Sequence, residues 1–275
     1  MQDQTIGFIG GGNMAHSLIG GLIADGVPAE NIRVADPGDP VRHQLTADFA
    51  VPTQRDNGGM ADCDVLVLAV KPQMLHTVVD EMAEEIRERR PLVISVAAGV
   101  RLGTLTRWLA DDTLPLVRAM PNTPALVQSA ATGLCANVVV TDGQRALAEA
   151  ILRAVGITLW VEDETRLDAV TAISGSGPAY FFLFMEALEA AGERLGLDAA
   201  QAQRLAVQTA FGAAKMALES PDDPAELRRR VTSPGGTTER ALEVFDSGNL
   251  RDLVAEAAEA ARVRADELAN LLDEH

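Results

Sequence analysis

The first part of the chain alternates short apolar runs with longer stretches in which apolar residues recur at helical spacing. Runs of this length, separated by segments such as Gln73 to Arg89, are typical of strands in a mainly parallel sheet with crossover helices. The pattern therefore predicts a doubly wound α/β domain. Its expected strands lie in the sequences TIGFIG, NIRVAD, DVLVLAV, PLVISVAAG, LPLVRAM, TGLCANVVV and ITLWV.

From about Glu162 onward the strand pattern stops, and segments rich in Ala, Leu, Glu and Arg follow with breakers between them. We expect an α/β domain over residues 1–161 and an all-helical domain over residues 162–275. The apolar stripe of the last helix fits an intramolecular core and a contact with a second subunit equally well. The expected helices are Pro178 to Leu195, Ala199 to Glu219, Pro224 to Arg230, Thr237 to Asp246 and Leu250 to Leu272.

The sequence IGFIGGGNMA, at the first predicted strand, has the form of a dinucleotide-binding fingerprint. Gly10 permits a tight turn, Gly12 lets the backbone approach a pyrophosphate, and Ala15 lets the helix pack closely on the strand. The N-terminus of the following helix offers free N–H groups to the anion. Because a strand precedes the motif and a helix and a second strand follow it, we expect a bound nucleotide rather than a purely structural turn.

The sequence leaves the choice between NAD and NADP open. Asp36 ends the second predicted strand and can accept hydrogen bonds from an adenosine ribose, which favours NAD. The sequence DPGDP that begins with this residue is also ordinary turn chemistry. Arg33 and Arg42 lie near enough in the sequence to meet the 2′-phosphate of NADP instead.

Two further stretches follow predicted strands, at the edge where open α/β sheets bind ligands. In AVKPQ, Pro72 ends the strand and Lys71 is one of only two lysines in the chain. In RAMPNTPA, two prolines hold the loop and Asn122 supplies an amide that can donate and accept. Loop formation explains the prolines but not the lysine and the asparagine, so we expect these two to lie along a cofactor.

The sequence TSPGGTTER, late in the chain, holds more breakers than a turn between helices requires. Pro234 favours an extended Ser233, two glycines let the backbone bend, and a helix resumes at about Thr237. We expect the amides of Gly236, Thr237 and Thr238 to be unpaired there and to bind a carboxylate, with helix caps that hold no ligand as the alternative.

A second stretch, ISGSGPAYFF, predicts a small-residue loop from Ser174 to Gly177 before a helix that begins at Pro178. Glycine loops that open two helices form a compact anion pocket if the fold brings them together.

Five of these motifs carry a resemblance to a known family. IGFIGGGNMA, AVKP, VRAMPNTPA, SGSGPAY and TSPGGTT occur in the order and spacing of pyrroline-5-carboxylate reductases, and the likeness runs from about Ile6 to Leu272. The resemblance implies a Rossmann domain followed by a helical dimerisation domain. It also implies an active site between the domains at the dimer interface, with dimers that can assemble into a larger ring such as a decamer.

The implied reaction is the reduction of Δ1-pyrroline-5-carboxylate to L-proline, the last step of proline biosynthesis, by a hydride from NADPH or alternatively NADH. Thr238 corresponds to the family's threonine near the substrate nitrogen and is the implied catalytic residue. Asp56 falls where many members carry an asparagine that faces the adenosine, so adjacent Asn57 makes this contact through a one-residue shift or the contact is lost.

The expected site residues combine these arguments. For the substrate they are Ser174, Gly175, Ser176, Gly177, Pro178, Ser233, Gly236, Thr237 and Thr238. For the cofactor they are Gly10, Gly12, Asn13, Met14, Ala15, Asp36, Asn57, Ala69, Val70, Lys71, Pro72, Met120, Pro121 and Asn122.

The composition argues against several other classes of partner. The 275 residues are 47% apolar and 23% charged, as in globular proteins. An aromatic content of 4% and a formal net charge of −17 speak against binding to nucleic acid or to anionic membranes. Since no apolar run is long enough for a bilayer span and the N-terminus lacks the basic region of a signal peptide, we expect a cytoplasmic protein.

The metal-binding and redox residue types are few. Cys63 and Cys135 have no second thiol nearby and predict buried, reduced side chains. The histidines show no metal-ligand spacing, so we expect no metal site. They are His16, His43, His76 and His275.

Two other functions fit the sequence less well. A β-hydroxyacid dehydrogenase shares the plan of a Rossmann domain followed by helices, but it needs a lysine early on the helix after its glycine loop. Here the first lysine after Lys71 is Lys215, more than thirty residues beyond that position. A cofactor-binding protein without catalysis would not need to retain the TSPGGTT loop, so we expect an enzyme.

Overall fold

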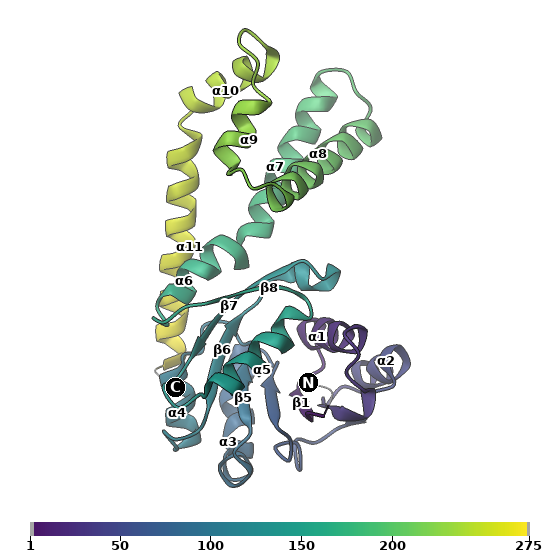
Figure 1. Ribbon diagram of the computed structural model, residues 1–275, viewed down its shortest axis with the longest axis vertical. Coiled ribbons are helices and arrows are strands. Elements are labelled where there is room, and N and C mark those ends of the chain that lie inside the picture. Colours follow the sequence, from purple (N-terminus) through teal and green to yellow (C-terminus); the bar gives the residue numbers. More distant parts are fainter. Residues whose placement is uncertain (1–2, 274–275) are drawn as a thin grey trace. The chain divides into compact units, whose positions relative to one another are not determined.

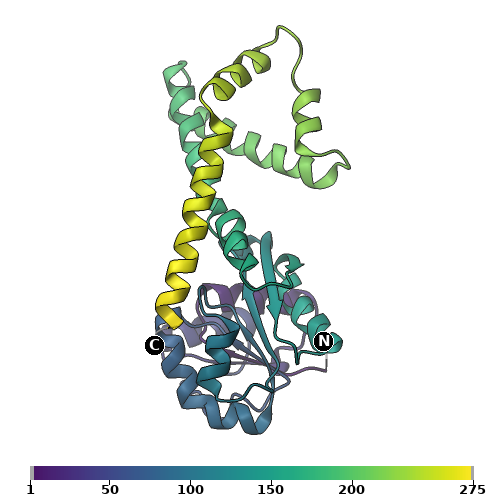
Figure 2. The same cartoon turned by 90° about the vertical axis from the view of Figure 1, so that its left-hand side faces the viewer.

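The structure is a computed structural model that describes residues 3–273 (Figures 1 and 2). Its contacts divide the chain into two compact units: one runs to Ser176 and resumes at Ala261, and the other is Gly177–Ala260. This division differs from the expected one at residue 161. The reason is that Leu167 is fully buried in the core of the first unit and Leu272, near the C-terminus, packs against the same core.

The first unit is built on an eight-stranded sheet in the order β3-β2-β1-β4-β5-β6-β7-β8 (Figure 1). The first six strands are parallel, which confirms the predicted α/β fold. The strands are β1 (Ile6–Ile9), β2 (Ile32–Ala35), β3 (Thr53–Gln54), β4 (Val65–Leu68), β5 (Leu92–Ser95), β6 (Leu116–Met120), β7 (Ala130–Ala136) and β8 (Gly156–Trp160).

The last two strands run in the opposite direction, which the sequence did not predict. β7 pairs antiparallel with β6, and β8 pairs parallel with β7. The connection between β6 and β7 contains only a short 3₁₀ helix, Thr123–Val127, and a parallel pair would need a much longer crossover. The expected strand TGLCANVVV was also too long, because β7 ends at Ala136 and the residues after it turn into α5.

Helices cover both faces of this sheet because alternate strand residues point to opposite sides. In β4, Val65 and Val67 join a core with α1, α2 and α5, whereas Leu66 and Leu68 join a core with α3 and α4. The helices of this unit are α1 (Asn13–Ala24), α2 (Asp39–Phe49), α3 (Pro72–Arg89), α4 (Leu102–Leu109), α5 (Asp142–Arg153) and α6 (Arg166–Val170). The doubly wound arrangement places the carboxyl ends of β1, β2 and β4 at one edge, where ligands bind in such folds.

The second unit is helical in all its regular structure, as predicted. Asp198 and Asp223 cap the N-termini of α8 and α9 by accepting hydrogen bonds from the third backbone amide of each helix. The elements are α7 (Gly177–Arg194), α8 (Ala199–Glu219), α9 (Pro224–Arg230), α10 (Thr237–Ser247) and the first part of α11 (Leu250–Asp273). Within the described part of the chain, no helix has the length and apolarity that a membrane span requires.

The predicted loop from Ser174 to Gly177 is wrong. α6 continues directly into a π-helical turn, Thr171–Gly175, and Ser176 keeps a right-handed helical backbone before α7 begins at Gly177. The Ser176 N–H donates to the Thr171 carbonyl at 2.8 Å, the i to i+5 spacing of a π turn. Small residues here therefore serve close packing of a helical segment rather than the bending of a loop.

Candidate active site

A cavity of about 600 Å³ lies at the carboxyl ends of β1, β2 and β4. It is lined by residues that follow each of these strands, so three separate connections meet at one place, as the fold predicts for a ligand site. Asp56 lines it beside Asn57, so the structure keeps both candidates for the adenosine contact. The predicted cofactor residues in its lining are Gly10, Gly12, Asp36, Asn57, Ala69, Val70 and Lys71.

The glycine loop has the geometry that a pyrophosphate requires. Gly10 has φ +92°, and a Cβ there would lie 2.7 Å from the carbonyl oxygen of Ala69. Gly12 has ordinary backbone angles, and a Cβ there would meet nothing within 4 Å. Gly12 is the N-cap of α1 without a side-chain cap, and the amides of Asn13 and Met14 donate to no acceptor among the described residues. The open space and the free amides fit the phosphates of a dinucleotide.

The Asp36 side chain bonds to two loops and also lines the cavity. One carboxylate oxygen accepts from the Gly11 N–H at 2.8 Å, and the other accepts from the Gly38 N–H at 2.8 Å. These bonds order the two loops beside the cavity. A carboxylate offers about four acceptor positions, so capacity for a ribose hydroxyl is left.

The arginines near this cavity differ in their partners. Arg33 donates to the carbonyl of Asp62, and Arg42 is held by an ion pair with Asp39. Arg55, which the sequence analysis missed, lines the cavity, is exposed, and has no hydrogen bond or ion pair with any described residue. Recognition of the two-residue strand β3 would have placed Arg55 at the cavity, because β3 pairs with β2 and directly precedes this residue.

The end of β6 and the π-helical turn bring together another group of predicted residues. The Asn122 side chain donates from Nδ2 to the Ser174 carbonyl at 2.9 Å and accepts at Oδ1 from the Ala131 N–H at 3.0 Å. A Cβ on Gly175 would lie 2.8 Å from Met120 Cε. The amide expected to meet a cofactor is therefore already bonded to the protein on both sides.

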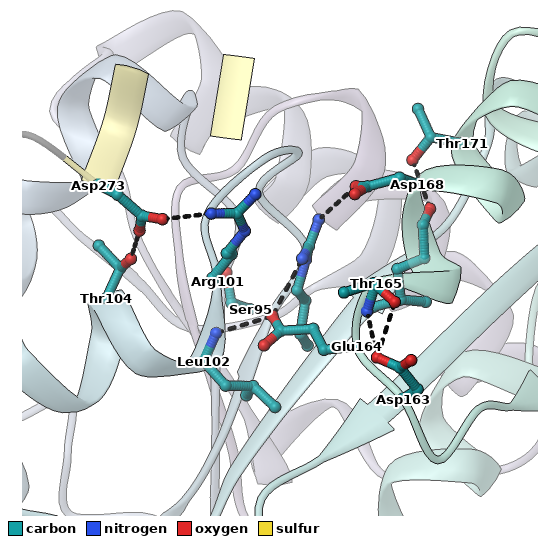
Figure 3. A network of polar contacts seen from close by, with 12 residues as sticks. Ser95, Arg101, Leu102, Thr104, Asp163, Glu164, Thr165, Asp168, Thr171 and Asp273 are labelled. Atoms are coloured by element: carbon teal, nitrogen blue, oxygen red, sulfur yellow. Dashed lines mark hydrogen bonds and ion pairs between the residues drawn. The ribbon is translucent and has the colours of Figure 1, made fainter. Parts of the chain in front are cut away.

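A buried ionic cluster is centred on Arg118 of β6. The Arg118 side chain is 3% exposed, and its guanidinium lies 3.0 Å from Glu164 and 3.8 Å from Asp168. Glu164 also accepts from the Leu102 N–H at 2.8 Å, which ties it to the start of α4 (Figure 3). Burial raises the pKa of Asp168, and the positive charge of Arg118 counters this. The cluster joins β6, α4 and α6.

A second ionic cluster fixes the last turns of α11 to the same unit. Arg101 donates to Asp273 at 2.6 Å (Figure 3). It also donates to Asp266 at 2.7 Å and to Asn270 at 2.8 Å. Thr104 also donates to Asp273. These contacts attach α11 to α4.

Pro72 lies outside the first cavity, although the sequence placed it with the cofactor. It lines a neighbouring cavity of about 570 Å³ together with Gly99, Arg118, Asp168 and Leu272. This second cavity lies beside the first at the N-terminus of α3, where Lys71 lines one cavity and Pro72 the other.

In the second unit, the TSPGGTT sequence forms the predicted bend before α10. The helix begins at Thr237 with Gly236 as an N-cap that has no side-chain bond. The Gly236 amide is not unpaired as expected, because it donates to the Ser233 carbonyl at 3.0 Å and closes the turn. The amides of Thr237 and Thr238 have no acceptor among the described residues, so two of the three expected donors are free.

This loop also binds a carboxylate of its own chain. Gly235, at φ +70°, donates its N–H to Glu239 at 2.7 Å. Gly177 and Pro178 open α7 in the same unit.

Two family descriptions match the chain. Residues 5–99 match NADP oxidoreductase, coenzyme F420-dependent, and residues 164–268 match pyrroline-5-carboxylate reductase dimerisation. A pyrroline-5-carboxylate reductase of Pseudomonas aeruginosa is 51% identical over 99% of both chains. The chain belongs to the pyrroline-5-carboxylate reductase family. This confirms the resemblance and the order of a Rossmann-type domain before a helical dimerisation domain.

Solved pyrroline-5-carboxylate reductases have the same fold. One from Coxiella burnetii is 47% identical, covers 96% of this chain and 98% of its own, and superimposes with a TM-score of 0.93. One from Plasmodium falciparum, solved with NADP bound, is 29% identical over 98% of this chain and 99% of its own, with a TM-score of 0.84.

No group of side chains among the described residues forms a metal site, and His275 lies outside them. Cys63 and Cys135 are free thiols. Burial raises the pKa of Cys63 to about 11 and also raises that of Cys135. Both thiols stay protonated near neutral pH, so neither is an activated nucleophile.

Proposed function

We propose that this chain reduces Δ1-pyrroline-5-carboxylate to L-proline with NADPH as the hydride donor, the last step of proline biosynthesis. The observation that carries the proposal is the 51% identity to a pyrroline-5-carboxylate reductase over 99% of both chains. The cavity beside Gly12 supports it, because the chain keeps the space and the free amides that the dinucleotide needs.

NADPH is proposed over NADH on two grounds. The Plasmodium falciparum relative was solved with NADP bound. In this chain Arg55 lines the same cavity as Asp36 and has no hydrogen bond or ion pair with the residues that the structure describes. An arginine is well suited to a phosphate. Arg33 and Arg42, the candidates in the sequence, are already bonded to other groups.

We therefore expect Arg55→Ala to raise the Kd for NADPH by about 10- to 100-fold, the loss of one or two charge-assisted hydrogen bonds. The Kd for NADH should stay within about twofold, since it has no 2′-phosphate. Fluorescence titration with each cofactor measures both values, with Arg33→Ala and Arg42→Ala as matched controls. Equal weakening of both cofactors, or a selective loss in a control instead, would disprove the assignment.

The bound dihydronicotinamide supplies a hydride to the carbon of the C=N bond. The task of the chain is to hold the ring carboxylate, align the acceptor carbon about 3 to 3.5 Å from the nicotinamide, and exclude water. The free amides of Thr237 and Thr238 at the start of α10 suit the carboxylate, and we assign Ser233 and Gly236 to the same loop. Ser174 to Pro178 complete the proposed substrate set.

The Thr238 hydroxyl can donate to a neutral imine nitrogen or accept from an iminium N–H. A protonated substrate already has an electrophilic carbon, so the hydroxyl orients the ring and needs no shifted acidity.

Thr238→Ala should lower kcat/KM by about 10-fold without abolishing turnover, which is the cost of one hydrogen bond. Thr238→Ser should recover most of the loss because it restores the hydroxyl. Ser247→Ala is the control, since Ser247 lies at the other end of α10 and its hydroxyl donates to the Val244 carbonyl. Steady-state kinetics decide the matter, and an unchanged kcat/KM in Thr238→Ala would remove the role.

We also propose that two copies pair through their helical units. In a single chain these helices expose many large apolar side chains, which a partner would cover. Among them are Phe181, Phe182, Phe184, Leu205, Phe211 and Leu253. Light scattering distinguishes a dimer from a larger ring such as a decamer. A small-molecule enzyme with two free thiols fits the cytoplasm.

The test of the reaction is the loss of reduced-nicotinamide absorbance when Δ1-pyrroline-5-carboxylate is added to the purified protein, with NADPH and NADH in parallel. We expect oxidation that depends on the imine and is faster with NADPH. Protein that binds NADPH but oxidises neither cofactor would contradict the proposal.

A further inference from the structure

One face of β6, continued by Asn122, contacts the segment that runs from Glu164 through α6 and the π turn. Every second residue of a strand points to the same side, and the backbone stays extended to Asn122, which has φ −133° and ψ 169°. The contacts are Arg118 with Glu164 and Asp168, Met120 with Gly175, and Asn122 with the Ser174 carbonyl.

The last of these contacts has a cause in the sequence. In a helix the Ser174 carbonyl would accept from the N–H four residues on, but that residue is Pro178, which has no N–H. The carbonyl therefore lacks an α-helical donor at the point where the π turn meets α7. The Asn122 amide supplies the missing donor at 2.9 Å, while its oxygen accepts from Ala131 at 3.0 Å.

We propose that Asn122 is a positioning residue, which takes the carbonyl that Pro178 leaves free and so holds the π turn against Met120. Asn122 is 8% exposed, and both the nitrogen and the oxygen of its side-chain amide are bonded to backbone groups. Asn122 affects the reaction by fixing the positions of Ser174 and Gly175, not by a hydrogen bond to the cofactor. π turns are often found at functional sites, and this one is held at the end of β6 by the contacts of Met120 and Asn122.

The consequence rests on the proposed function. Hydride transfer is sensitive to the distance and angle between donor and acceptor, and a displacement of about 1 Å costs on the order of 100-fold in rate. Loss of the Asn122 link should therefore slow the hydride step while the cofactor phosphates stay bound at Gly12.

Asn122→Asp tests this with little change of shape. One carboxylate oxygen can still accept from Ala131, but the other faces the Ser174 carbonyl and repels it. Asn137→Asp is the matched control, because Asn137 donates to the Leu114 carbonyl at 2.7 Å and accepts from the Leu116 N–H at 3.2 Å, at the opposite end of β6. Asn122→Ser breaks the same link without burying a charge and serves if Asn122→Asp does not fold.

Two measurements read the result. Hydrogen exchange of the amides in residues 171–176 should become faster in the Asn122 variants and stay unchanged in Asn137→Asp. The kcat of the Asn122 variants should fall by about 10- to 100-fold, and their NADPH Kd should stay within about twofold of the wild-type value. Comparison of ordinary NADPH with NADPH deuterated at the transferred position should show a larger kinetic isotope effect than in the wild type.

Weaker NADPH binding without faster exchange would overturn the inference, because it would make Asn122 a direct cofactor contact. Equal behaviour of Asn122→Asp and Asn137→Asp would reduce Asn122 to a general structural role and would also overturn it. A wild-type protein without turnover would instead count against the proposed function, and the exchange measurement would still test the link.

Discussion

Replacing Gly12 with alanine should weaken NADPH binding by about 100-fold or more, equal to about 2.7 kcal/mol, and leave the stability of the fold unchanged. A Cβ at this position meets no protein atom within 4 Å, and the backbone has φ −66°, which alanine adopts freely. The open space is where the pyrophosphate must approach the backbone, so the new methyl group excludes the ligand rather than the chain.

Gly103→Ala is the matched control, because a Cβ there also meets nothing within 4 Å and the residue lies on α4, outside the cavity. It should bind NADPH as the wild type does. Gly10→Ala should instead unfold more easily, since its φ of +92° and the Ala69 carbonyl at 2.7 Å both oppose a side chain. Titration and thermal melts separate these effects, and wild-type affinity in Gly12→Ala would show that the pyrophosphate takes another path.

Replacing Arg118 with methionine should lower the free energy of unfolding by about 3 to 5 kcal/mol, the usual cost of removing one partner from a buried ionic cluster. The Arg118 side chain is 3% exposed, and its loss leaves Glu164 and Asp168 without their cation. Arg153→Met is the control, because Arg153 is 66% exposed and its pair with Glu149 is a surface pair. The control should cost less than about 1 kcal/mol.

The deficit of Arg118→Met should depend on pH. Burial raises the pKa of Asp168 above its ordinary value of 3.8, and Arg118 opposes that rise. Without the arginine, the Asp168 carboxylate becomes protonated at a higher pH in the folded protein than in the unfolded chain. The stability linked to that proton is present in acid and is lost as the pH rises through the folded pKa. Urea unfolding at several pH values and one protein concentration should show a deficit that grows from acid to neutral pH, and a deficit that shrinks would contradict this account.

Much of the fold was predictable because its signals are local. The N-termini of α8 and α9 follow Asp198 and Asp223, whose side chains make the caps, and both helices match the predicted bounds. The glycine fingerprint lies between a strand and a helix, so its geometry is encoded within ten residues. The resemblance of five motifs to one family supplied the reaction, which no pattern of apolar residues specifies.

The errors arose where distant contacts decide the structure. Composition predicted a loop at Ser174, but the bond from Asn122, which follows β6, allows a helical segment there. The direction of β7 depends on the length of a connection rather than on the strand itself. Arg55 has no distinctive motif, and only the pairing of β3 with β2 brings it to the cavity.

The most direct test of the central claim follows the transferred hydrogen. Purified protein is given Δ1-pyrroline-5-carboxylate and NADPH deuterated at the transferred position of the nicotinamide, and the proline formed is analysed by mass spectrometry and NMR. The account predicts L-proline with one deuterium on the ring carbon that was doubly bonded to nitrogen. Proline without deuterium at that carbon, or no proline from protein that binds NADPH, would contradict it.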